Sequence, residues 1–471
     1  MKLCLTVSAE TNADARQQLM RAPSSADLVE IRIDAINDLY LPELLRRPRP
    51  SVIVTNRIAA EGGRFSGSEA EQFDILSRAM RLGAEYIDVE LAWGRKFINR
   101  LSSVNRQTKM IASYHNFRET PKGLGKTYES LVRTGTYATK IATMASDISD
   151  NRIIFDLLRR ARTEKRRIIG LCMGDRGQIS RILTHRYGGF LTYAPLKEDC
   201  ATAPGQLSLA ELIKTYSVHT LNSRTRLFGL LGNPVSRSKG VFYHNRVFQR
   251  RKMNAVYLNF LADDISRFMD SFRTAFTGLS VTMPFKETII PFLDNLDEST
   301  GPLGAVNTVV VKRGKRIGFN TDMPAVQALL KPLGPRQKNT IVLGTGGTAA
   351  AMACAARILG SNTTIVGRNR EKTEELAERF DCRAASFEEL AALPCDILMN
   401  GTSIGMNPEN DPEILPPLFL KKKMAVIDAV YGGQETPLVA RAREIGCIVI
   451  PGMELFERQA KFQSKLFCEA M

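Results

Sequence analysis

Short apolar runs recur from Leu3 to Leu196 and alternate with segments of helical periodicity. The eight runs are LCLTVSA, LVEIRID, SVIVTNR, YIDVEL, KMIASYHNF, YATKIATM, RRIIGLCM and FLTYAPL. Runs rich in Val, Ile and Leu that alternate with helices are typical of parallel strands, and eight of them favour a closed (β/α)8 barrel. Polar and ionisable residues gather at the ends of these runs, where barrels of this kind build their active sites. The sequence therefore predicts an α/β barrel with a site at that end.

The pattern changes between His219 and Arg226, where the polar segment HTLNSRTR precedes a new apolar run, RLFGLLGNPV. We interpret this change as a boundary between two domains. From Asn339 the chain reads NTIVLGTGGTAAAMACAARILG and then TTIVGR, which is a strand, a Gly-rich turn, an Ala-rich helix and a second strand. This order predicts a Rossmann-type nucleotide-binding domain in the second half of the chain.

Length and composition agree with several globular domains, because the 471 residues are 44% hydrophobic and 24% charged. The eight cysteines show no CxxC spacing, so we expect reduced thiols rather than disulfides or a zinc site. The apolar run in MKLCLTVSAE is too short for a signal peptide, and no stretch of about 18 apolar residues occurs. We therefore expect a soluble, cytoplasmic protein.

The formal net charge is +16, which suits nucleic acid, an anionic membrane or small anionic substrates. Lys and Arg are spread along the whole chain, and the densest clusters lie at the ends of predicted elements. Those clusters are Arg46, Arg47 and Arg49; Lys165, Arg166 and Arg167; and Lys421, Lys422 and Lys423. Without a basic tail or an aromatic-studded basic stripe, we expect neither a nucleic-acid nor a membrane partner, and small anionic substrates remain.

Lys140 is the most informative residue of the barrel, because it lies in the middle of the apolar run YATKIATM. Lysine is rarely buried without a partner, and desolvation beside other cations turns it into a nucleophile for carbonyl carbons. His115 ends the preceding run and is a candidate general base. A lone strand lysine is more often a snorkelling edge residue, and a lone histidine is usually structural, so these two residues need further support.

That support comes from six motifs: EIRID, TNR followed by EGG, SYHNF, TKIA, MGDRGQISR and ATAPGQ. Their order over nearly all of the first 215 residues resembles the type I 3-dehydroquinate dehydratases. The resemblance implies that Lys140 forms a Schiff base with the ketone at carbon 3 and that His115 removes the proton from carbon 2. It also implies that Glu90 orients the histidine and that no metal is needed.

The same resemblance implies a set of substrate contacts in the barrel. Arg181 would bind the substrate carboxylate as a bidentate partner. The remaining predicted contacts are Glu30, Arg32, Arg57, Gln206 and Thr202. Thr202 stands where the family usually has serine in a loop that closes over the site, and its hydroxyl is retained.

The Gly-rich turn LGTGGTAAA contains Gly344, Gly346, Gly347 and Thr348 directly between a predicted strand and a predicted helix. Backbone amides at such a turn bind the pyrophosphate of a dinucleotide. Arg368 ends the next strand, where an NAD-specific enzyme commonly has an acidic residue, and we expect it to bind the 2′-phosphate of NADP. Arg370 and Lys372 are candidates to assist it.

Seven motifs around this turn resemble shikimate dehydrogenase: GNPVSRS, VTMPFKE, GAVNT, FNTD, NGTSIGM, DAVY with TPL, and GMELFERQA. The resemblance implies that Lys286 and Asp322 are the catalytic pair, which exchanges a proton at the carbon 3 hydroxyl while NADPH exchanges hydride. The implied contacts to shikimate are Ser238, Thr282, Asn307, Tyr431 and Gln459. The segment from Asn400 to Met406, which includes Thr402, would line the nicotinamide pocket, and Gly452 is a further expected cofactor contact.

Together the two resemblances imply a bifunctional lyase and NADP-dependent oxidoreductase. Residues 1–218 would form the dehydratase barrel, residues 225–332 with 447–471 the shikimate-binding lobe, and residues 333–446 the NADP-binding lobe. The expected small-molecule partners are 3-dehydroquinate, 3-dehydroshikimate and shikimate.

Three positions depart from the shikimate dehydrogenase pattern. Gly240 replaces a serine that binds the substrate carboxylate, Ser280 replaces an asparagine, and Met323 replaces a glycine. Two alternatives therefore stay open: quinate as the substrate of the second domain, or a non-catalytic regulator that senses quinate or shikimate. The regulator would have lost catalytic positions, whereas Lys140, His115, Lys286 and Asp322 are all retained.

Overall fold

The computed structural model describes residues 2–196, 203–236, 238–301, 303–407, 409–411, 413–416, 418–431 and 435–471. The chain divides into two compact units. The first contains Met1–Thr225, Lys252–Val256 and Phe260–Arg273, and the second contains the rest. Three sheets, one of eight strands and two of six, organise the described residues.

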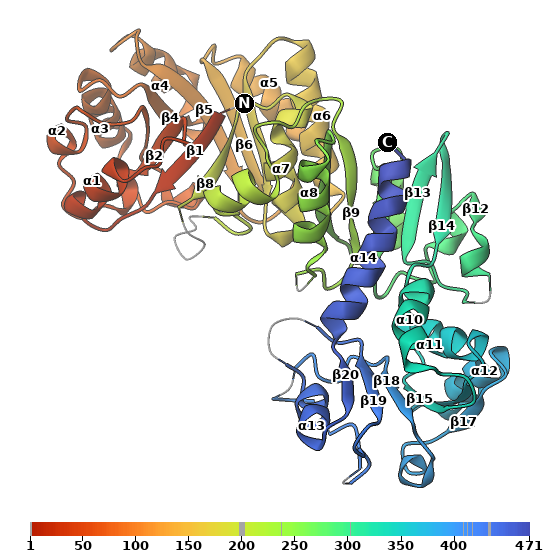
Figure 1. Cartoon of the computed structure of the whole chain (residues 1–471). Coiled ribbons are helices and arrows are strands. Elements are labelled where there is room, and N and C mark those ends of the chain that lie inside the picture. Colours follow the sequence, from red (N-terminus) through yellow and green to blue (C-terminus); the bar gives the residue numbers. More distant parts are fainter. Residues whose placement is uncertain are drawn as a thin grey trace. The chain divides into compact units, whose positions relative to one another are not determined.

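The first sheet is a parallel barrel, as expected from the eight apolar runs (Figure 1). Its strand order is β7-β6-β5-β4-β3-β2-β1-β8, and a backbone hydrogen bond of 2.7 Å from Phe190 N, just before β8, to Ile168 O of β7 brings the two ends of the sheet together. The strands are β1 (Lys2–Val7), β2 (Leu28–Arg32), β3 (Val52–Thr55), β4 (Tyr86–Glu90), β5 (Lys109–Asn116), β6 (Ala138–Met144), β7 (Ile168–Met173) and β8 (Leu191–Pro195).

Helices surround this sheet (Figure 1), and each of them has buried side chains. Ser68 and Glu71 form a capping box that fixes the start of α3. The helices are α1 (Asn12–Met20), α2 (Leu41–Leu44), α3 (Glu69–Arg81), α4 (Gly94–Ser102), α5 (Leu124–Val132), α6 (Asp150–Thr163) and α7 (Gln178–Tyr187). After β8 a short π-helix, Glu211–Thr215, follows.

The second sheet has the order β10-β9-β11-β13-β14-β12 and mixes parallel with antiparallel pairs. Its strands are β9 (Arg226–Gly232), β10 (Ala255–Leu261), β11 (Gly278–Val281), β12 (Asn295–Leu296), β13 (Thr308–Lys312) and β14 (Lys315–Phe319). The helices of this region are α8 (Gly240–Arg250), α9 (Ile265–Phe272), α10 (Asp322–Leu330) and the C-terminal α14 (Gly452–Glu469).

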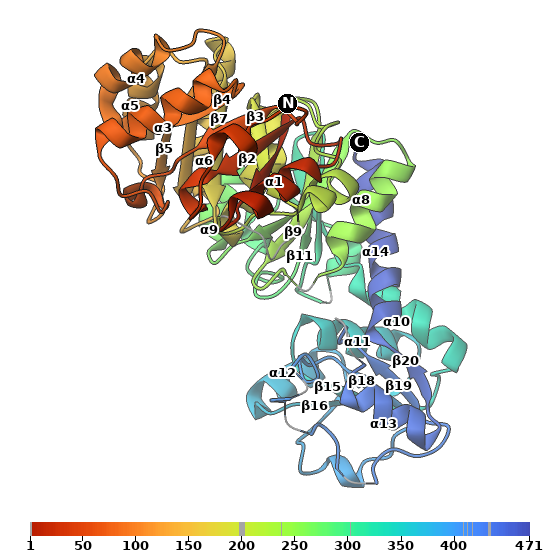
Figure 2. The ribbon, with the colours of Figure 1, turned by 90° about the vertical axis from the view of Figure 1, so that its left-hand side faces the viewer.

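The third sheet is parallel and has the Rossmann order, β17-β16-β15-β18-β19-β20. Its strands are β15 (Asn339–Leu343), β16 (Asn362–Val366), β17 (Arg383–Ala385), β18 (Ile397–Asn400), β19 (Ala425–Asp428) and β20 (Ile448–Ile450). Its helices are α11 (Gly347–Ile358), α12 (Arg370–Arg379) and α13 (Pro437–Ile445), and α13 covers the face opposite α11 and α12 (Figure 2).

β20 pairs with β19 and so extends the nucleotide-binding sheet. Residues 447–450 were expected in the other lobe, and this expectation is corrected: the chain leaves the third sheet after Ile450, and α14 begins at Gly452. The three-residue strand IVI gives no alternating pattern by which the sequence could have assigned it to a sheet.

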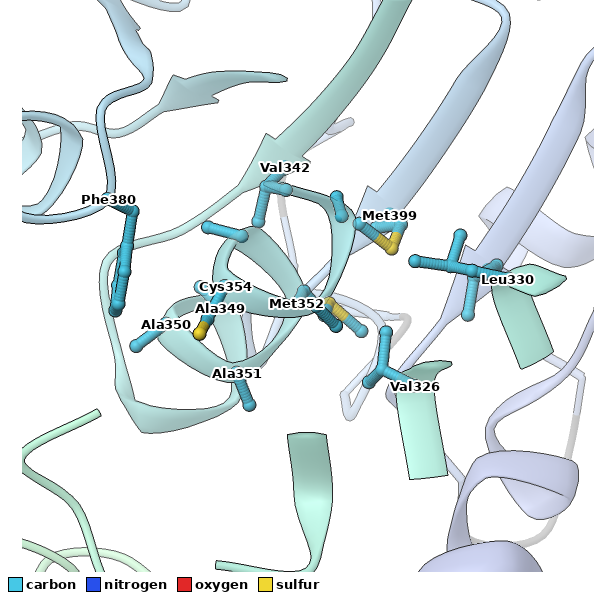
Figure 3. Close-up of a cluster of buried hydrophobic side chains, with 14 of the residues drawn as sticks. Val326, Leu330, Val342, Ala349, Ala350, Ala351, Met352, Cys354, Phe380 and Met399 are labelled. Carbon is cyan, nitrogen blue, oxygen red and sulfur yellow. The ribbon is translucent and has the colours of Figure 1, made fainter. Parts of the chain in front are cut away.

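The Ala-rich helix α11 is almost entirely buried between β15, β18 and α10 (Figure 3). Small side chains at Ala349, Ala350 and Ala351 let the neighbouring elements approach closely, and Met352 fills the space toward Val326 and Leu330 of α10. This packing fixes α10, whose first residue is the predicted catalytic Asp322.

Candidate active sites

Lys140 lies on β6 with its side chain directed into the barrel, and it is only 5% exposed. Its Nζ donates to Asp88 Oδ2 at 2.9 Å and to Glu30 Oε1 at 3.3 Å. The parallel register places Lys140 beside Ser113 on β5, and Ser113 Oγ donates to Asp88 Oδ1 at 2.6 Å. Side chains from three other strands, β2, β4 and β5, therefore position the buried amine of Lys140 on β6.

Arg57 follows β3 and is the second buried cation of the barrel. It pairs with Asp88 at 2.7 Å and with Glu90 at 2.8 Å. Burial raises the pKa of Asp88, but Arg57 and Lys140 outweigh burial and hold that pKa well below its usual range. Asp88 is thus a permanent anion between two cations, and it keeps both in place.

His115 pairs with Glu61, since its Nδ1 lies 2.9 Å from Glu61 Oε2 and its backbone N–H donates to the same oxygen at 3.0 Å. Burial, with Arg57 and Lys140 nearby, lowers the pKa of His115 well below its usual value. Burial raises the pKa of Glu61 to about 7. A neutral imidazole with Nδ1 directed at a carboxylate leaves Nε2 available as a base.

The expected pairing of Glu90 with the histidine is therefore corrected. Glu90 Oε1 accepts from Arg57 and from the backbone N–H of Ile58, and Glu90 Oε2 accepts from Trp93. The register explains the difference, because Glu90 lies opposite Ser113, two residues before His115. The sequence did contain a hint of this role, because Glu61 is the first residue of the motif EGG and lies four residues after Arg57.

Arg181 on α7 is 1% exposed and forms no ion pair with any residue that the structure describes. Its guanidinium donates to the carbonyl of Pro204 at 3.3 Å, and its Nε has no hydrogen-bond partner within the described ranges. Burial lowers the pKa of Arg181 to about 10. A buried, unpaired guanidinium fits an anionic ligand.

A cavity of about 50 Å³ connects these residues. Its lining includes the predicted residues Glu30, Arg32, Arg57, His115, Lys140, Arg181 and Gln206, together with Glu61. Arg32 forms a bidentate ion pair with Asp34, in which both hydrogen bonds are 2.8 Å long. Thr202 lies outside the described residues, and Glu90 is not part of the cavity wall.

In the second unit Lys286 Nζ donates to Asp322 Oδ2 at 2.6 Å. Asn307 donates to the other carboxylate oxygen of Asp322 at 2.7 Å, and its own Oδ1 accepts from the backbone N–H of Thr321. Asn307 is fully buried. The two motifs GAVNT and FNTD therefore meet, and Asn307 orients the carboxylate.

A cleft of about 470 Å³ adjoins this pair. Its lining contains these predicted residues: Ser238, Thr282, Lys286, Asp322, Tyr431, Gln459, Gly346, Gly347, Thr348, Thr402 and Met406. Three further predicted residues, Asn307, Gly344 and Gly452, are not part of its wall. Asn307 acts through Asp322, and Gly452 packs so tightly that a Cβ would lie 2.2 Å from Val430 O.

The departures from the family pattern have local explanations. A Cβ at Gly240 would lie 3.2 Å from both Ser238 Oγ and the Tyr257 hydroxyl. Ser280 accepts from the Tyr257 hydroxyl at 2.7 Å and donates to Gln463 at 2.9 Å. Met323 packs against Cys354 of α11. Gly240, Ser280 and Met323 therefore each fit their surroundings: Gly240 by its small size, Ser280 by hydrogen bonds and Met323 by packing.

The turn between β15 and α11 has the features of a dinucleotide site. Gly344 adopts a φ of +103°, which favours glycine, and Gly346 caps α11 without a side-chain hydrogen bond. The first N–H groups of α11 therefore remain for a ligand, which fits a pyrophosphate. Arg368 is exposed, lines a hollow beside β16 and forms no ion pair within the described part of the chain. These residues fit NADP.

Among the described residues, no three His, Cys, Asp or Glu side chains come together as a metal site. No helix in the described part of the chain is both long and apolar enough to cross a membrane.

Two family models match the chain. Type I 3-dehydroquinase matches residues 3–223, and the shikimate dehydrogenase substrate binding domain matches residues 230–309.

Two relatives match nearly the whole chain, and a solved structure matches about half of it. The chloroplastic bifunctional 3-dehydroquinate dehydratase/shikimate dehydrogenase of Arabidopsis thaliana is 35% identical over 94% of this chain and 77% of its own length. The shikimate biosynthesis protein AroDE of Chlamydia pneumoniae is 29% identical over 99% of this chain and 95% of its own. The solved shikimate 5-dehydrogenase of Thermus thermophilus, in complex with NADP(H) and shikimate, is 27% identical over 52% of this chain and all of its own, with a TM-score of 0.46.

Proposed function

The chain belongs to the family of bifunctional 3-dehydroquinate dehydratase/shikimate dehydrogenases and is an enzyme of the shikimate pathway; from this premise we propose how each site works. The barrel dehydrates 3-dehydroquinate through an imine on Lys140. The second unit then reduces 3-dehydroshikimate to shikimate with NADPH. The observation that carries the proposal is the buried Lys140, which lies in one cavity with the His115–Glu61 pair and an unpaired Arg181.

In the barrel, the Lys140 amine bonds to the ketone carbon, and the ketone oxygen leaves as water. The resulting iminium withdraws electrons, so that the proton on carbon 2 becomes acidic enough for His115 to take. The electrons then expel the carbon 1 hydroxyl, which leaves as water with the proton that His115 returns. Hydrolysis of the imine releases the product and restores Lys140.

The surrounding residues bind and orient the substrate. Arg181 binds the substrate carboxylate, while Glu30, Arg32, Arg57, Gln206 and Thr202 contact its other oxygens. Glu61 takes the role for which Glu90 was expected, because it lies at hydrogen-bond distance from His115. Glu90 acts on Arg57 instead.

In the second unit, bound NADPH supplies the hydride, and the protein supplies the proton and the charge. Lys286 donates a proton to the oxygen that forms at carbon 3, and its ammonium stabilises negative charge there. Asp322 holds Lys286 at 2.6 Å, and Asn307 holds Asp322. Ser238, Thr282, Tyr431 and Gln459 contact shikimate.

We assign the cofactor and the domains as follows. Gly344, Gly346, Gly347 and Thr348 would bind the pyrophosphate, Arg368 and Lys372 would bind the 2′-phosphate, and Thr402, Met406 and Gly452 would contact the nicotinamide. Residues 1–218 form the dehydratase, residues 225–332 with the C-terminal helix bind shikimate, and residues 333–450, which include β20, bind NADP. We place the reactions in the cytoplasm, which seven free cysteines among the described residues support.

Two variants separate the activities. We expect Lys140→Met to lose turnover of 3-dehydroquinate while it still oxidises shikimate with NADP. Lys286→Met should consume 3-dehydroquinate and accumulate 3-dehydroshikimate. The assays follow 3-dehydroshikimate by its ultraviolet absorbance and NADPH by its own.

The same assay decides between the alternatives. Turnover of quinate equal to or better than that of shikimate would replace shikimate as the substrate of the second unit. A folded wild-type protein without either activity would favour the sensing regulator.

A further inference from the structure

Tyr193 lines the barrel cavity, and the proposed mechanism does not use it. It belongs to β8, where the register pairs it with Cys4 of β1, and it is 3% exposed. Its side chain is part of the apolar cluster that fills the barrel and also part of the cavity wall. Tyr193 therefore lies where the apolar core meets the polar layer around Lys140.

The ring of Tyr193 lies against the amine of Lys140. The distance from Nζ to the ring centroid is 4.4 Å. The same Nζ donates to Asp88 at 2.9 Å and to Glu30 at 3.3 Å. The amine is thus enclosed by two carboxylates and one aromatic face. An aromatic face attracts a cation, and it does so more strongly when both are removed from water.

The charge at this nitrogen is the same before and after the covalent step. An ammonium and a ketone give an iminium and one water, so that one positive charge enters and one remains. The nitrogen forms a bond to the ketone carbon, the carbon–oxygen bond breaks, and the oxygen leaves with two protons from the nitrogen. A ring that attracts this cation therefore favours neither state over the other, and it fixes the position of the nitrogen in both.

The hydroxyl of Tyr193 has a different character from its ring. It is buried and has no hydrogen-bond partner among the described residues. Burial, with Glu30 as the second cause, raises the pKa of Tyr193 well above its usual value, so the phenol stays neutral. A buried hydroxyl without a partner destabilises a fold rather than supports it. The part of Tyr193 that can act on Lys140 is therefore its ring, which faces Nζ.

We propose that Tyr193 is a positioning residue of the dehydratase, whose ring face holds the cationic nitrogen of Lys140 both as the ammonium and as the iminium. The inference rests on the imine mechanism proposed above. It adds a residue that contacts the reacting nitrogen through its π-face and not through a hydrogen bond.

Two substitutions separate the ring from the hydroxyl. Tyr193→Phe keeps the ring, and Tyr193→Leu keeps an apolar side chain without a π-face. The enzyme is mixed with saturating 3-dehydroquinate and borohydride, and intact mass gives the fraction of protein trapped as the reduced imine. We expect Tyr193→Phe to match the wild type within about twofold. Tyr193→Leu should show a clearly smaller trapped fraction and a kcat about tenfold lower, since without the ring the nitrogen is no longer held in place for the ketone carbon, and a small misplacement of a reacting atom lowers the rate. KM should change little.

Phe155→Leu is the matched control for the loss of a buried ring. Phe155 lies on α6, is 1% exposed and stacks on Tyr187 at 4.1 Å, outside the cavity wall. Its trapped fraction should equal that of the wild type, although its stability falls. Tyr193→Met serves as a second ring-free variant if Tyr193→Leu does not fold.

A ring-free variant that folds and is trapped as fully as the wild type would overturn the inference while leaving the imine mechanism intact. The same holds if Tyr193→Phe is as impaired as Tyr193→Leu, because the hydroxyl would then be the acting group. A wild-type protein that is not trapped at all would overturn both the inference and the proposed function.

Discussion

At the scale of single residues, proton transfer in the barrel depends on the pair formed by Glu61 and His115. Glu61 accepts two hydrogen bonds from His115, one from the ring and one from the backbone. A carboxylate accepts these bonds more strongly than a carboxylic acid does, and burial raises the pKa of Glu61 to about 7. The orientation of the base is therefore sensitive to pH in the neutral range.

We predict that the kcat/KM of the dehydratase falls as the pH decreases through about 7, since protonation of Glu61 weakens the hydrogen bonds that orient His115. Glu61→Gln should lower kcat by roughly ten- to a hundredfold and flatten the profile between about pH 6 and 8. Glu90→Gln is the comparison, and it should keep the fall near pH 7. The reverse result, with Glu90→Gln flattening the profile, would restore the assignment that the sequence suggested.

Cofactor choice is a second residue-scale property. Arg368 forms no ion pair within the described residues, whereas Arg370 pairs with Glu374 at 2.8 Å. Arg368→Asp should therefore lower kcat/KM for NADP by roughly a hundredfold and bring NAD closer to it, because a charge-assisted contact to the 2′-phosphate is lost. Arg370→Ala should have a much smaller effect. Equal losses in both variants would argue against a dedicated role for Arg368.

Residue types in ordered motifs located Lys140, Arg181, Lys286 and Asp322 from the sequence, and the structure places each in a cavity or cleft. The sequence did not identify the carboxylate that pairs with His115, because Glu61 and Glu90 both lie near the ends of predicted strands and either could reach it. Choosing between them needs the register of β4 against β5, which no single sequence contains.

At the scale of elements, His244 of α8 and Ser464 of α14 connect these two helices through a side-chain hydrogen bond. His244 Nδ1 lies 2.9 Å from Ser464 Oγ, and the imidazole stacks on Tyr257 at 4.5 Å. Burial lowers the pKa of His244 to about 3. Since an unfolded histidine titrates near 6.5, the unfolded chain takes up this proton first.

Stability contributed by neutral His244 is therefore fully present above about pH 6.5 and is lost as the pH falls toward 3. Between pH 7 and pH 5 the loss should be about 2 kcal/mol. Hydrogen exchange of the α8 and α14 peptides measures it, and His244→Asn should show a smaller difference between the two pH values. His219→Asn is the control at an exposed histidine. An identical pH dependence in His244→Asn and wild type would contradict this account.

Periodicity predicted the long elements well and the short ones poorly. All eight apolar runs of the first unit became strands of the barrel, and the Gly-rich turn joins β15 to α11 as expected. β20, with three residues, could not be assigned from its pattern, because strands that short depend on the sheet they join.

At the scale of the whole molecule, one chain carries two sites for consecutive reactions. The first site holds a buried lysine among carboxylates, and the second holds a lysine–aspartate pair beside a glycine-rich turn. The alternation of strands and helices predicted both architectures. The change of pattern between His219 and Arg226 agrees with the division after Thr225. The two units differ in how they use lysine. We propose that Lys140 forms a covalent bond with its substrate and that Lys286 does not.

Borohydride trapping with 3-dehydroquinate, followed by peptide mass mapping, tests this division most directly. We predict a stable mass increment on the β6 peptide that contains Lys140, and none on the peptide that contains Lys286. An unmodified Lys140 in folded protein, or an increment on Lys286 instead, would contradict the account.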